Sequence, residues 1–153
     1  MLSDRDIIRI ANDAYNEFMV NFLVDCQFEV VSLNKFVTLA EKNNIISIVD
    51  KSRNVKNINF PVITLSGEKF KIFYCSNVIA KIIKGFSKEK QKMFIGAITL
   101  HELYHIVNRV EKRDLTVFSF LRSEKKAFLE FKEDYPSLVR ILYEVKKRFK
   151  IRK

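Results

Sequence analysis

The sequence predicts an α+β fold in which helices surround a small antiparallel sheet of about three strands. Apolar residues recur at helical spacing near both ends of the chain, whereas residues 45–75 form short β-rich runs. Gly and Pro are rare, with three and two copies, which excludes collagen-like, linker-rich and many-turned β folds. The 153 residues, 48% of them hydrophobic, are enough to build one core.

The first third of the chain is expected to hold two helices. Ser3 can cap a helix, and the apolar residues that follow at helical spacing extend it over residues 4–26. A second helix follows Ser32 and ends near residues 43–44.

Three strands are expected next, at residues 45–49, 60–65 and 69–75. A short connector containing Gly67 separates the last two and indicates a hairpin, so the strands form an antiparallel meander. The strand from Lys69 to Cys75 is the predicted edge strand, because its alternating lysines would discourage edge-to-edge aggregation.

Helices are expected in the rest of the chain, at about residues 76–85, 87–108, 116–133 and 137–149. We interpret residues 1–153 as a single domain with three parts. These are a helical N-terminal part over 1–44, the sheet with its central helices over 45–136, and a basic C-terminal helix over 137–153.

The composition narrows the class of protein. Cys26 and Cys75 lie among apolar residues and form no CxxC motif, so a disulfide scaffold is excluded. The charged start predicts no signal peptide, and the longest apolar run is too short to predict a membrane span. We therefore expect a cytoplasmic protein.

The only two histidines of the chain form an HExxH motif with Glu102. His101 and His105 stand four residues apart, so on a helix both imidazoles can face one metal ion. Glu102 projects about 100° away, close enough to act on a water bound to that metal. From Met93 to Val107 there is no Lys or Arg and apolar residues lie all round, which is typical of a buried helix. The alternative is a pair of packed histidines with ordinary hydrogen bonds.

A catalytic zinc takes three protein ligands, and the third must be Glu, Asp or Cys because no other His is present. Glu124 lies in the middle of an apolar stripe on the predicted helix 116–133, so its carboxylate is expected to point into the core and to need a cation. The alternatives are an ion pair with a buried Lys or Arg, or ligation by Glu130 or Glu133.

The HExxH motif, followed after 18 residues by Glu124, resembles the zinc ligands of gluzincin metallopeptidases. The small size also resembles the minimal gluzincins and the ImmA/IrrE-like metallopeptidases, over about residues 60–135. This chain has Leu103-Tyr104 where the immunity-type enzymes favour Leu-Gly, and Phe128 where thermolysin-type enzymes carry an Asp. The resemblance implies a zincin-like fold with a buried HExxH helix.

The resemblance also implies a small intracellular zinc-dependent peptidase, expected to be an endopeptidase, with Zn²⁺ as cofactor and a polypeptide as substrate. His101, His105 and Glu124 would bind the metal, and Glu102 would act as general base. Tyr135 and Tyr143 are candidate transition-state helpers. The substrate would add as a strand to the predicted edge, where the candidate residues are the following: Lys69, Lys71 and Phe73.

Two other functions stay open. The first is an inactive or restrained zincin-fold interaction protein. The second is a basic nucleic-acid-binding protein with a coincidental HExxH, because the net charge is +10 and residues 146–153 are strongly basic. Those residues could also contact other anionic surfaces.

Overall fold

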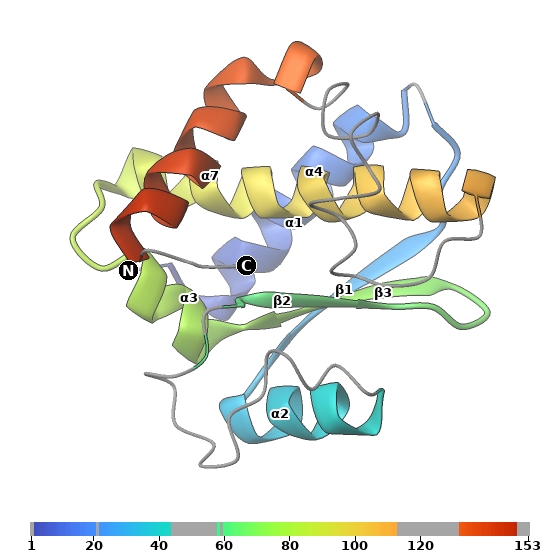
Figure 1. Ribbon diagram of the computed structural model, residues 1–153, viewed down its shortest axis with the longest axis horizontal. Helices are drawn as coiled ribbons and strands as arrows, with labels where there is room; N and C mark the ends of the chain where they lie inside the picture. Colours follow the sequence, from blue (N-terminus) through green and yellow to red (C-terminus); the bar gives the residue numbers. More distant parts are fainter. Residues whose placement is uncertain (1, 21, 44–57, 59, 113–131, 150–153) are drawn as a thin grey trace.

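A computed structural model of the chain describes residues 2–20, 22–43, 58, 60–112 and 132–149 (Figure 1). It is an α+β protein with a mixed sheet at its centre. The elements follow in this order: α1 (Asp4–Phe18), β1 (Cys26–Val31), α2 (Leu33–Lys42), β2 (Val62–Leu65), β3 (Phe70–Cys75), α3 (Ser76–Ile82), α4 (Lys88–Lys112) and α7 (Pro136–Phe149).

The described sheet has the strand order β1-β3-β2. β2 and β3 form the predicted antiparallel hairpin, with Val62 opposite Tyr74, but β1 pairs with β3 in parallel, with Cys26 opposite Phe70. The expectation of a purely antiparallel sheet is therefore wrong. A parallel pair needs a long crossover connection, and α2 and β2 both lie in the segment that joins β1 to β3.

β3 is the central strand of the three, so the prediction that Lys69–Cys75 forms an edge is also wrong. Lys71 is paired on one side with Gln27 of β1 and on the other with Leu65 of β2. The backbone of β3 is thus occupied on both sides at Lys71 and Phe73, which leaves no free edge there for a substrate strand, while Lys69 lies just before β3.

The first helix ends much earlier than the apolar spacing predicted. Ser3 does cap α1: its hydroxyl accepts from the backbone N–H of Asp6, and the backbone N–H of Ser3 donates to the Asp6 carboxylate, which completes a capping box. The helix stops at Phe18, and Cys26 begins β1. Residues 26–31 are rich in β-formers and pair with β3, and this long-range pairing outweighs the local helical pattern.

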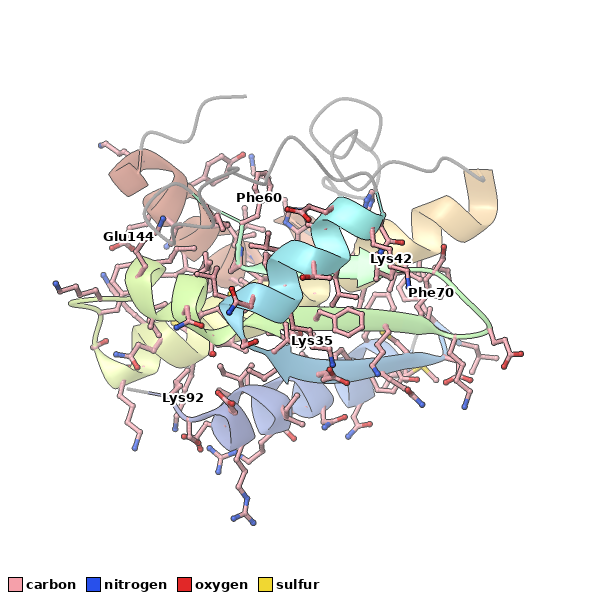
Figure 2. All side chains as sticks on the ribbon, turned by 90° about the horizontal axis from the view of Figure 1, so that it is seen from below. Lys35, Lys42, Phe60, Phe70, Lys92 and Glu144 are labelled. Atoms are coloured by element: carbon pink, nitrogen blue, oxygen red, sulfur yellow. The ribbon has the colours of Figure 1, made fainter. Side chains whose placement is uncertain are left out.

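The elements form layers, with α1 and α4 on one face of the sheet, α7 outside α4, and α2 on the opposite face (Figure 1). The α2 side carries a charged cluster in which Glu29 binds both Lys35 (2.7 Å) and Lys71 (3.0 Å). Figure 2 looks at this side, with Lys35 on α2 in front of the sheet. The core lies between the sheet, α1 and α4, where side chains such as Phe18, Ile72 and Phe94 are fully buried.

The C-terminal predictions have mixed outcomes. The helices expected at 87–108 and 137–149 are confirmed as α4 and α7, and the short helix expected at 76–85 as α3, which ends at Ile82. The strand predicted at 45–49 and nearly all of the helix predicted at 116–133 lie outside the described residues. No helix in the described part of the chain combines the length and the apolar character needed to cross a membrane.

Candidate metal and catalytic site on α4

The HExxH motif lies within α4, which starts where the Ser87 hydroxyl accepts a hydrogen bond from the backbone N–H of Lys90 (3.2 Å). The motif is enclosed as predicted, because Glu102 and His105 are buried and His101 is half-buried. On the opposite side of α4 from the sheet, Tyr104 packs edge-to-face on Phe18 of α1. The helix is therefore held from two sides at the motif itself.

Glu102 faces the sheet and is held by β2. The hydroxyl of Thr64 donates a hydrogen bond to Oε1 of Glu102 at 2.6 Å. Glu102 is only 5% exposed and Thr64 only 1%, so this bond is shielded from water. A hydrogen bond to a charged acceptor is among the stronger ones, and it fixes the carboxylate of the motif against the sheet.

His101 and His105 lie one helical turn apart, on the flank of α4 between the sheet-facing and outward-facing residues. Burial, and to a smaller extent the neighbouring His105, lowers the pKa of His101 to about 3. His101 is therefore neutral at physiological pH, and the neutral imidazole is the form that binds metal ions.

A layer of buried polar groups lies between α4 and the sheet, next to Glu102. The hydroxyls of Tyr74 and Thr99 are 2.5 Å apart, and Thr99 also donates to the carbonyl of Ile95 (2.8 Å). Burial, together with the nearby carboxylates of Asp25 and Glu102, raises the pKa of Cys26 to about 12. Cys26 and Tyr74 are thus neutral groups close to the charge of Glu102.

The outer edge of β2 is the edge nearest Glu102. The backbone N–H of Cys75 donates to the carbonyl of Pro61 (2.8 Å), which fixes the alternation of hydrogen bonds along the hairpin. In an antiparallel pair, alternate residues turn their backbone groups toward the partner and away from it. Val62 and Thr64 therefore direct their N–H and C=O groups away from β3, on the side of β2 that pairs with no other described strand, and both residues are buried.

The remaining predicted site residues are not brought to the motif by a described contact. Glu124 and the alternative Glu130 lie outside the described residues, whereas Glu133 is exposed. Tyr135 interacts with Glu17 of α1, and burial raises its pKa, while Tyr143 is 48% exposed on α7. The helper role of either tyrosine stays a prediction.

The residues on α4 fit part of a zinc site. Zinc takes imidazole nitrogens and carboxylate oxygens as ligands, and His101 and His105 supply two imidazoles on one side of a helix. Within the described ranges, no three side chains of His, Cys, Asp or Glu converge on one point. The predicted third ligand, Glu124, lies in the range 113–131, outside the described residues.

Sequence reasoning missed Thr64, which lies 38 residues before Glu102. One signal was present, because Thr64 is the single hydroxyl residue in the apolar run from Phe60 to Leu65. A buried hydroxyl needs a partner, so its position in such a run indicates a polar group across the interface.

Comparisons of the chain with family models, with curated proteins and with solved structures found no match.

Proposed function

We propose that this protein is a small zinc-dependent peptidase of the gluzincin type, with a zincin-like arrangement of sheet and HExxH helix. The observation that carries the proposal is the position of Glu102. It is a buried carboxylate next to two histidines at metal-binding spacing, and it is held by the hydroxyl of Thr64 on β2. A general base beside two metal-binding imidazoles suits hydrolysis by a metal-activated water.

The proposed substrate is a polypeptide, and its scissile carbonyl would lie beside the histidines of α4.

When bound, zinc supplies a Lewis acid that acidifies the attacking water and polarises the scissile carbonyl. Glu102 takes one proton from the water as the water oxygen bonds to the carbonyl carbon. The C–N bond then breaks, and Glu102 gives that proton to the leaving nitrogen, so that a carboxylic acid and an amine are released. His101 and His105 would hold the metal, with Glu124 as the proposed third ligand.

The test uses the purified full chain, zinc analysis and a peptide library. We expect about one zinc per chain, and we expect Glu102→Gln to retain zinc while cleavage falls by at least about a hundredfold. Glu89→Gln is the matched control, because Glu89 is an exposed glutamate on the same helix. Its cleavage should equal that of the wild type.

Two results would favour the other functions. Zinc in the wild type without cleavage of any peptide would favour a restrained zincin-fold interaction protein. Salt-sensitive DNA binding that survives His101→Ala and is weakened by deletion of residues 146–153 would favour a nucleic-acid-binding protein.

A further inference from the structure

Thr64 is the residue of β2 that holds the carboxylate of the motif. Its hydroxyl donates to Oε1 of Glu102, and the whole residue is only 1% exposed. Val62, two residues earlier on the same face of β2, has an apolar side chain.

Burying the hydroxyl of Thr64 costs free energy unless the hydroxyl has a hydrogen-bond partner. Thr64 is 1% exposed, and valine would fill the same volume in a strand without a polar group to satisfy. A carboxylate only accepts hydrogen bonds, so the hydrogen of the Thr64 hydroxyl must point at Glu102. The bond therefore restricts a glutamate side chain that otherwise has three rotatable bonds.

We infer that Thr64 is the positioning residue of the general base. Its hydroxyl fixes Oε1 of Glu102, so that the proton of the attacking water is transferred at Oε2. This inference rests on the proposed peptidase function.

The test compares Thr64→Val, Thr64→Ser and Thr99→Val with the wild type. Thr99→Val is the matched control, because Thr99 is a buried threonine of the same polar layer that bonds Tyr74 and Ile95. We expect Thr64→Val to lower kcat about tenfold to a hundredfold, with KM within about threefold and zinc content unchanged. Thr64→Ser should keep kcat within about threefold of the wild type, as should Thr99→Val.

A second measurement is independent of activity and uses the zinc-free protein. Thr64→Val and Glu102→Leu should each lower the melting temperature, since each leaves the other side chain short of its partner. The double variant, in which the polar pair becomes an apolar pair, should melt higher than the sum of the two losses predicts.

The outcomes distinguish the positioning role of Thr64 from the proposed peptidase function. A wild type that cleaves, together with a Thr64→Val variant that keeps its kcat, overturns the positioning role and leaves the peptidase intact. Equal losses of kcat in Thr64→Val and Thr64→Ser overturn the positioning role as well, because the serine retains the hydroxyl. Additive melting losses show that Thr64 and Glu102 are not coupled and overturn it without reference to catalysis. Zinc binding without cleavage in the wild type overturns the peptidase itself.

Discussion

Tyr74 donates a hydrogen bond to Thr99, and the direction of this bond follows from the local geometry. The hydroxyl of Thr99 has one hydrogen, which it gives to the carbonyl of Ile95 one turn earlier in α4. The bond to Tyr74 therefore uses the hydrogen of the tyrosine, so the central strand β3 is the donor and the HExxH helix is the acceptor. This buried bond joins the helix to the sheet just before His101.

Removal of the Tyr74 hydroxyl should weaken the packing of α4 on β3. Tyr74→Phe keeps the ring and leaves Thr99 without the donated hydrogen, so we expect the free energy of unfolding to fall by about 1 kcal/mol. Urea unfolding of the two proteins measures the difference. Tyr143→Phe is the control, because Tyr143 is 48% exposed and its loss should have little effect. Equal stability of Tyr74→Phe and the wild type would contradict the bond.

The third metal ligand can be tested by zinc content. Glu124→Ala should lower bound zinc well below one per chain, since a zinc site with two protein ligands is weak. Glu130→Ala and Glu133→Ala are the comparison variants and should retain their zinc. If Glu124→Ala keeps zinc and one of the other two loses it, the third ligand is that other glutamate.

The buried thiol of Cys26 predicts an alkaline loss of stability. A cysteine in the unfolded chain has its ordinary pKa of 9.0, whereas burial keeps Cys26 protonated in the folded protein up to a pKa of about 12. Between these values the unfolded state releases a proton and the folded state does not. The stabilising contribution is therefore complete below pH 9 and is lost as the pH rises toward 12.

Urea unfolding under reducing conditions at about pH 8 and about pH 10.5 measures this effect. We expect the wild type to lose about 2 kcal/mol more between the two pH values than Cys26→Ala does, since each pKa unit corresponds to about 1.4 kcal/mol. Other ionisable groups are the same in the two proteins and cancel in the comparison. Equal losses of stability in the wild type and in Cys26→Ala would mean that burial does not raise the pKa of the thiol.

The part of the fold that follows from local pattern was predictable. The helix around His101 is apolar on all sides and follows a serine cap, and the β2–β3 hairpin has a short connector containing Gly67. Each of these features is encoded within a short stretch of the chain. The burial of Glu102 and His105 follows from the same apolar pattern.

The features that depend on distant segments were not predictable. β1 pairs with β3 across α2, and nothing within Cys26–Val31 specifies a parallel partner 44 residues later. The central position of β3 follows from that pairing, so the prediction of β3 as an edge strand was wrong. The bond from Thr64 to Glu102 likewise joins a strand and a helix 38 residues apart.

The contact between Phe18 and Tyr104 has a consequence for synthesis on the ribosome. The end of α1 leaves the ribosome about 86 residues before its aromatic partner, a delay of roughly 4–17 s at ~5–20 residues per second. During that interval the apolar side of α1 has no α4 to cover it, while the β2–β3 hairpin and α4 emerge close together. A truncated nascent chain that stops before residue 104 should accordingly recruit holdase chaperones to its first helix.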